Sequence, residues 1–185
     1  LGVQRTPLTR ALWPLLKQEL TLADALELWD EAQYREERYA ALAVLRARKV
    51  AVPEAVLQHL VVTGAWWDLV DEIATKLLDP DEVDVRMWAV ADDMWMRRAA
   101  IICQVGRKAD TDPVLLTDVI EPNLADRRFW ITKAIGWALR DFAYTDGPWV
   151  REFVASHDLA PLSKREAMKH LGGPLEKSSP VENHL

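Results

Sequence analysis

The sequence predicts an all-α fold in which antiparallel helix pairs stack into a curved solenoid. Two observations carry this prediction. Apolar residues recur at helical spacing, and no segment sustains the alternation of apolar and polar residues that is typical of a half-buried strand. Prolines also recur near the starts of helical segments, dividing the chain into two-helix units of about 25 to 35 residues. An ordinary all-helical bundle is the alternative, because similarity between the units is weak.

The chain begins with three predicted helices, over residues 6–19, 22–29 and 33–48. Thr6 followed by Pro7 is typical of a helix start, since threonine caps free amide groups and proline fits the first helical position. The third helix ends with Arg46, Arg48 and Lys49, which is the favoured place for cations along the helix dipole.

Four helix pairs follow, and each opens near a proline. They are predicted over 53–63 with 66–78, 80–91 with 93–106, 113–122 with 127–144, and 148–156 with 163–171. Such pairs cannot bury their apolar faces alone, so each pair stacks on its neighbours. Residues 172–185 are polar and are expected to form a loose end. The sequence therefore predicts one domain over 1–171 and a C-terminal tail over 172–185.

Composition excludes several classes of protein. Half of the 185 residues are apolar, which excludes a disordered chain, and no apolar run is long enough to cross a bilayer. Cys103 is the single cysteine, so no internal disulfide can form, and we expect a small buried side chain in a reducing cytoplasm. The four histidines show no ligand spacing, and we expect neither a metal site nor a cofactor.

Charge is unevenly distributed along the chain. The net charge of −6 by itself argues against nucleic-acid binding. Residues 22–95, however, carry a net charge of −9, whereas residues 97–140 carry +3. Because local potential governs binding, an acidic protein of this kind can still present one basic face.

The stretch that begins at Gly64 combines a predicted helix stop with a new helix. Two adjacent tryptophans, Trp66 and Trp67, cannot both enter one core, so at least one should reach the surface. Trp67 and Asp71 are four residues apart and share a helix face. An indole beside a carboxylate can hold an apolar or cationic group. The alternative is that this stretch is simply a helix corner.

The predicted helix over 93–106 carries two adjacent cations. Arg97 and Arg98 point about 100° apart, so one can cross to a neighbouring helix while the other faces solvent or a partner. The alternative for either is an ordinary ion pair.

The helix over 127–144 carries a stripe that is typical of contact with a phosphate backbone. Its members are Trp130, Lys133, Trp137 and Arg140. Alternatively, the tryptophans belong to the core and the cations extend past them. Gly136 lies inside this helix, where a close approach by another helix or by a ligand would explain it.

These residues together resemble the AlkD family of DNA alkylation repair glycosylases. The resemblance runs in the family's order to about residue 171. Its main motifs are Trp66-Trp67-Asp68-x-x-Asp71, Met94-Trp95-x-x-Arg98-Ala99-Ala100-Ile101, Lys133-Ala134-Ile135-Gly136-Trp137-x-Leu139-Arg140 and Leu159-Ala160-Pro161-Leu162-Ser163-x-Arg165-Glu166-Ala167. Leu1-Gly2-Val3-Gln4 and Leu28-Trp29-Asp30 add to it.

The resemblance implies a solenoid of HEAT-like repeats whose concave face holds duplex DNA. It implies excision of positively charged alkylated purines, chiefly N3-methyladenine and N7-methylguanine, without a metal or cofactor. By resemblance, the catalytic carboxylate falls on Asp71, the indoles that flank the deoxyribose on Trp67 and Trp137, the phosphate-contacting arginine on Arg98, and a further polar site residue on Gln4. From the stripe we add Arg140 and Lys133 as DNA-binding residues. A monomer in the bacterial cytoplasm or nucleoid, with no membrane contact, is expected.

Two departures from the family bear on this expectation. The family has further helices ahead of the stretch at Leu1, and without them we expect one wall of the DNA cleft to be missing and DNA affinity or activity to be reduced. The segment between Leu78 and Trp88 is also shorter than in the family. Two other functions stay open, namely a catalytically silent DNA-binding solenoid and a protein-binding scaffold with an apolar concave face.

Overall fold

The structure is a computed structural model, and it describes residues 20–48 and 51–172. This part of the chain is all-helical, as the sequence predicts, and contains no strand. Its helices are α2 (Leu22–Asp30), α3 (Arg35–Ala47), α4 (Glu54–Gly64), α5 (Trp67–Lys76), α6 (Val85–Ala89), α7 (Met94–Ile102), α8 (Pro113–Ile120), α9 (Phe129–Phe142), α10 (Gly147–Ser156) and α11 (Pro161–Ala167), with 3-10 turns at η1 (Lys108–Asp110) and η2 (Glu121–Asn123). The predicted helix over 6–19 and all but one residue of the predicted tail lie outside the described residues.

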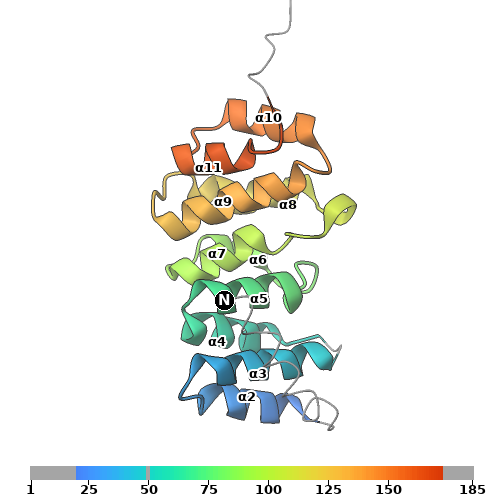
Figure 1. Cartoon of the computed structure of the whole chain (residues 1–185), viewed down its shortest axis with the longest axis vertical. Coiled ribbons are helices and arrows are strands. Elements are labelled where there is room, and N and C mark those ends of the chain that lie inside the picture. The colour runs from blue at the N-terminus through green and yellow to red at the C-terminus, as the bar shows by residue number, and fades with distance from the viewer. Residues whose placement is uncertain (1–19, 49–50, 173–185) are drawn as a thin grey trace, which may run out of the picture.

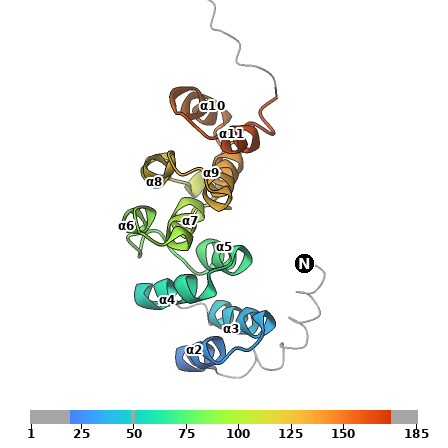
Figure 2. The same cartoon turned by 90° about the vertical axis from the view of Figure 1, so that its left-hand side faces the viewer.

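From α2 to α9 the helix pairs follow one another along the long axis of the molecule, and α11 then lies between α9 and α10 (Figure 1). Seen from the side, they form two layers that bend into an arc (Figure 2). Helices α2, α4, α6, α8 and α10 lie on the convex side of the arc, and α3, α5, α7, α9 and α11 lie on the concave side. Helix α7 lies in the middle of the concave layer, with contacts to α5 and α9. The predicted curved stack of helix pairs is therefore confirmed.

Half of the described α-helices start at a residue whose side chain caps the helix. Thr21 and Asp24 form a reciprocal capping box at α2, and the carboxylates of Asp93, Asp112 and Asp146 accept backbone N–H groups at α7, α8 and α10. The start predicted at Pro80 is wrong. Residues 80–82 form a turn, and α6 begins at Val85 because the Asp84 carboxylate caps it through the Met87 N–H.

The apolar core lies between the two layers and includes two large indoles. Trp29 is fully buried and its Nε1–H donates to the Thr63 hydroxyl at 2.8 Å. Trp88 is 2% exposed and donates to the Glu54 carboxylate at 2.9 Å. Each indole thus joins two helix pairs, and its one polar atom is satisfied.

Gly64 has a packing role in addition to its place at a helix end. It is the last residue of α4, but the left-handed residue that ends the helix is Ala65, at φ 35°. A Cβ on Gly64 would lie 3.1 Å from the Trp29 ring. Glycine at this position therefore lets the buried indole pack directly against α4.

Among the helices that the structure describes, none is both long and apolar enough to span a bilayer.

Candidate DNA-binding and catalytic site

A buried ion pair joins three successive helices of the concave layer. Arg98 on α7 donates from Nε to Oδ1 of Asp71 at 2.8 Å and from Nη2 to Oδ2 at 2.9 Å. Its Nη1 donates to the backbone carbonyl of Trp130 on α9 at 2.6 Å. A two-point arginine–carboxylate pair is strong and fixes orientation as well as distance. Arg98 thereby fixes the plane of the Asp71 carboxylate relative to α9.

Helical periodicity sets the position of Asp71. Val70 and Ile73 are fully buried against the core, and Asp71 lies on the opposite side of α5. The Asp71 side chain is 14% exposed, whereas that of Arg98 is 4% exposed. The carboxylate therefore keeps partial access to solvent, while the guanidinium that orients it is almost completely covered.

Five aromatic side chains form a cluster beside this ion pair. Trp130 is their centre. Its ring stacks on that of Trp67, with centroids 6.4 Å apart and planes 13° apart, and it contacts the rings of Trp66, Trp95 and Phe129. The Arg98 guanidinium lies 5.7 Å from the Trp130 ring centroid. Trp66 is 41% exposed and Phe129 is 55% exposed, so the cluster presents apolar surface to solvent. As expected, at least one of the adjacent tryptophans reaches the surface.

Trp137 lies away from the predicted Trp67–Asp71 pair along the axis of α9. It follows Trp130 by seven residues, which places it on the same face about 10 Å further on. It is partly exposed, and it makes no ring contact with the aromatic cluster in the part of the chain that the structure describes. The structure pairs Asp71 with Arg98, and the indole that stacks on Trp67 is that of Trp130.

Asp68 is a buried carboxylate that sequence reasoning did not single out as a site residue. Its side chain is 4% exposed and accepts a hydrogen bond from the Tyr39 hydroxyl on α3, while an Arg35 nitrogen lies 3.9 Å from the same oxygen. Burial, reinforced by this carboxylate, raises the pKa of Tyr39. The Arg35 guanidinium lies 5.1 Å from the Trp66 ring centroid, so this network holds the start of α5 against α3.

All four members of the α9 stripe, Trp130, Lys133, Trp137 and Arg140, are partly exposed, although Trp137 also packs against the core. The two cations of the stripe are paired, however. Lys133 Nζ lies 3.1 Å from one carboxylate oxygen of Glu166 on α11, and Arg140 donates to the other.

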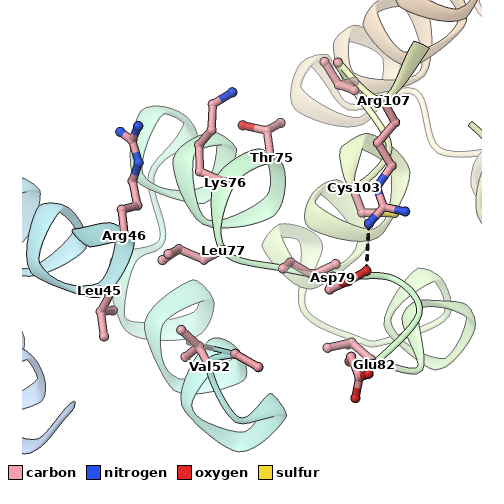
Figure 3. Close-up of a pocket in the computed structure, with 15 residues that line it drawn as sticks. Leu45, Arg46, Val52, Thr75, Lys76, Leu77, Asp79, Glu82, Cys103 and Arg107 are labelled. Carbon is pink, nitrogen blue, oxygen red and sulfur yellow. Dashed lines mark hydrogen bonds and ion pairs between the residues drawn. The ribbon is translucent and has the colours of Figure 1, made fainter. Parts of the chain in front are cut away.

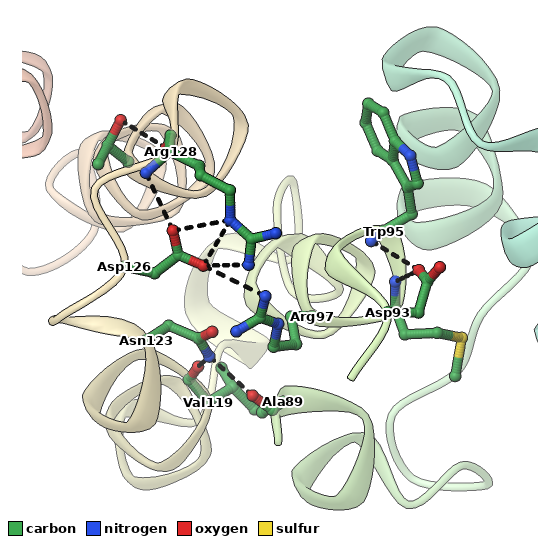
Figure 4. A network of polar contacts seen from close by, with 10 residues as sticks. Ala89, Asp93, Trp95, Arg97, Val119, Asn123, Asp126 and Arg128 are labelled. Carbon is green, nitrogen blue, oxygen red and sulfur yellow. Dashed lines mark hydrogen bonds and ion pairs between the residues drawn. The ribbon is translucent and has the colours of Figure 1, made fainter. Parts of the chain in front are cut away.

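Other basic residues of the segment over 97–140 are also paired with carboxylates. Arg127 donates to Asp158 at 2.9 Å. Arg128 donates to Asp126, which also lies 3.2 Å from Arg97, so one carboxylate links two arginines from different helices (Figure 4). The basic face is therefore more neutralised than the count of cations in the sequence indicates.

A pocket of about 470 Å³ lies at the C-terminal ends of α3, α5 and α7 (Figure 3). Apolar side chains including Leu45, Val52 and Leu77 form part of its wall, and an Arg107–Asp79 ion pair of 2.7 Å lies beside it. Cys103 also borders this pocket, and burial raises the pKa of its thiol to about 12. No residue that the sequence predicts for the site lines this pocket.

The described residues contain no group of three or more histidine, cysteine, aspartate or glutamate side chains that could hold a metal ion. Gln4 lies outside the described residues, so its predicted place in the site stays a prediction. The direct phosphate contact predicted for Arg98 also stays a prediction. In this structure its hydrogen bonds go to Asp71 and to the Trp130 carbonyl.

Comparison with known proteins identifies a family and solved structures of similar fold. A family profile described as DNA alkylation repair enzyme matches residues 1–171. A solved structure described as a predicted DNA alkylation repair enzyme from Enterococcus faecalis is similar with a TM-score of 0.78 and 26% sequence identity, covering 94% of this chain and 87% of that one. A comparison with curated proteins finds no significant match.

Proposed function

Because this chain belongs to the DNA alkylation repair enzyme family, we propose that it is a DNA glycosylase of base excision repair. Its proposed substrates are the positively charged alkylated purines N3-methyladenine and N7-methylguanine in duplex DNA. The observation that carries the proposal is the Asp71 carboxylate, which is oriented by Arg98 beside the stacked indoles of Trp67 and Trp130 on the concave layer.

The chemistry of such a substrate matches this arrangement. An N3- or N7-alkylated purine carries a positive charge and is already a good leaving group, so its departure needs no protonation. As the glycosidic bond breaks, positive charge develops on the deoxyribose. A fixed carboxylate stabilises that charge more than it stabilises the ground state, which is what lowers the barrier. Asp71 is also suited to orient the water that attacks the sugar.

The indoles supply a second source of stabilisation. The face of an indole attracts a cation, by about 0.5 to 2 kcal/mol depending on desolvation. Trp67 shares a partly exposed face of α5 with Asp71, and its ring is proposed to contact the same sugar. Trp137 is proposed to contact the nucleotide from α9.

Arg98 is proposed to hold the Asp71 carboxylate in one orientation. Gln4, Lys133 and Arg140 are proposed to contact the DNA. The protein is proposed to act as a monomer in the bacterial cytoplasm or nucleoid.

Base release from methylated duplex DNA tests the proposal directly. We expect the wild-type protein to release both methylated purines and Asp71→Asn to release them about 100-fold more slowly or worse. Asp118→Asn is the matched control, since Asp118 pairs with Arg86 on the convex layer and should leave release unchanged. Thermal melting of each variant shows whether the loss of the buried charge pair has unfolded the site.

The other outcomes separate the alternatives. Full release by Asp71→Asn contradicts the role of this carboxylate. DNA binding without release by the wild-type protein favours a silent DNA-binding solenoid, and absence of both favours a protein-binding scaffold.

A further inference from the structure

Glu166 lies between the two cations of the α9 stripe. One of its carboxylate oxygens is 3.1 Å from Lys133 Nζ, and the other accepts a hydrogen bond from the Arg140 guanidinium. Lys133 and Arg140 are seven residues apart, so they lie on the same face of α9 two turns apart. Glu166 thus binds its two cations as a bridging phosphate group would, with one oxygen for each.

The backbone holds Glu166 in this place. A Cβ on Gly136 would lie 2.7 Å from the Glu166 Cβ and 3.1 Å from the Ser163 carbonyl oxygen. Only glycine lets α11 approach α9 so closely, and that approach carries the carboxylate to the cations. The Lys133 ammonium, followed by the Arg140 guanidinium, lowers the pKa of Glu166, so the side chain stays ionised at neutral pH.

The cluster is not fully neutralised. Two cations share one carboxylate, which leaves a net charge of +1. The side chains of Lys133 and Arg140 are 39% and 24% exposed, whereas that of Glu166 is 14% exposed. An anion that arrives from solvent therefore meets the cations first, with a fixed negative charge directly behind them.

We propose that Glu166 competes with DNA backbone phosphates for Lys133 and Arg140, and so keeps binding to undamaged duplex weak and reversible. This inference rests on the proposed function, because it assumes that the concave layer holds DNA. The negative charge of Glu166 opposes each phosphate that approaches the two cations. Glutamine at this position has nearly the same shape as glutamate and leaves both cations in place. It removes the negative charge that repels an approaching phosphate.

Binding of undamaged duplex DNA, measured by fluorescence anisotropy between 50 and 200 mM salt, tests this inference. We expect Glu166→Gln to bind roughly 3- to 10-fold more tightly than the wild type at 50 mM salt. Each added phosphate contact steepens the slope of log affinity against log salt by about 0.9, so this advantage should fall about 3-fold by 200 mM.

Two controls make the test specific to the cluster. Glu152→Gln removes the same charge from an exposed position on α10 in the convex layer, and it should change affinity far less. The second control compares the double variant Lys133→Met/Arg140→Met with the triple variant that adds Glu166→Gln. The gain from Glu166→Gln should disappear there, because no cation remains to be released.

The outcomes distinguish the inference from the proposed function. If the wild type binds DNA and Glu166→Gln binds no more tightly than Glu152→Gln, the inference is wrong and the proposed function stands. A gain that persists without the two cations also overturns the inference. If neither the wild type nor Glu166→Gln binds DNA, both fail. Binding by Glu166→Gln alone supports the inference in its strongest form.

Discussion

Two ion-pair clusters on the concave layer have the same chemistry and different surroundings. At the α5–α7 junction, one buried guanidinium makes two hydrogen bonds with one carboxylate and lies against the Trp130 ring. At the α9–α11 junction, one carboxylate serves two cations that remain partly exposed. In the first cluster the two opposite charges balance and the geometry is fixed, whereas the second cluster carries excess positive charge at the surface.

The difference shows how burial sets what an ion pair can do. A buried pair cannot lose one partner without leaving a charge in a poorly solvated place, so its geometry is held tightly. An exposed pair exchanges its partner for water or another ion at little cost. Asp71 and Arg98 are therefore suited to present a fixed charge to a reacting group, while Lys133 and Arg140 are suited to exchange one anion for another.

Arg98→Met should produce the largest change in stability. Removing the guanidinium leaves the Asp71 carboxylate at a site that is 14% exposed and deprives the Trp130 carbonyl of a donor. We expect a loss of about 3 to 5 kcal/mol in the free energy of unfolding, measured by urea denaturation. Arg127→Met breaks a pair in which both side chains are at least half exposed, and it should cost under about 1 kcal/mol. Equal losses in the two variants would contradict the view that burial sets how much an ion pair contributes to stability.

Gly136→Ala should have an intermediate effect. The added methyl group meets the Cβ of Glu166 and the backbone of Ser163, neither of which can move without shifting α11. We expect a loss of about 1 to 3 kcal/mol in a thermal or urea melt. Gly147→Ala is the comparison, since its nearest neighbour is the flexible end of Leu171 at 2.8 Å, and it should cost less. If Gly136→Ala left the stability unchanged, close packing would not be the reason for this glycine.

The smallest effect should appear in the pH dependence of stability. The folded-state pKa of Glu166 is lowered, chiefly by the Lys133 ammonium. Its stabilising contribution is therefore present above the unfolded value of about 4.3 and is lost as pH falls through the lower folded value. Because the cations are partly exposed, we expect the ion pair to contribute under about 1 kcal/mol to the free energy of unfolding. The stability difference between wild type and Glu166→Gln, measured by urea denaturation from pH 6 to pH 3, should shrink with falling pH. A constant difference would argue against this ion pair.

Local signals in the sequence determined the helices and the faces they expose. The spacing of apolar residues separates Val70 and Ile73 from Asp71, and it separates the stripe on α9 from the core. Such signals work because a helix is built from contacts between residues three and four apart. The start of α6 depends on the Asp84 cap rather than on periodicity, so the start predicted from Pro80 was wrong.

The sequence alone was enough for the fold class, for the pairing of helices into a stack, and for the shared face of Trp67 and Asp71. Only the tertiary structure decided which charges meet. Arg98 reaches Asp71 across 27 residues, and Glu166 reaches Arg140 across 26. No periodic pattern encodes these partners, because they depend on how closely neighbouring helix pairs approach, and at Gly136 a single missing methyl group sets that distance. The same dependence explains why Lys133 and Arg140, which the sequence presents as part of a basic face, are held in the folded chain by the Glu166 carboxylate from α11.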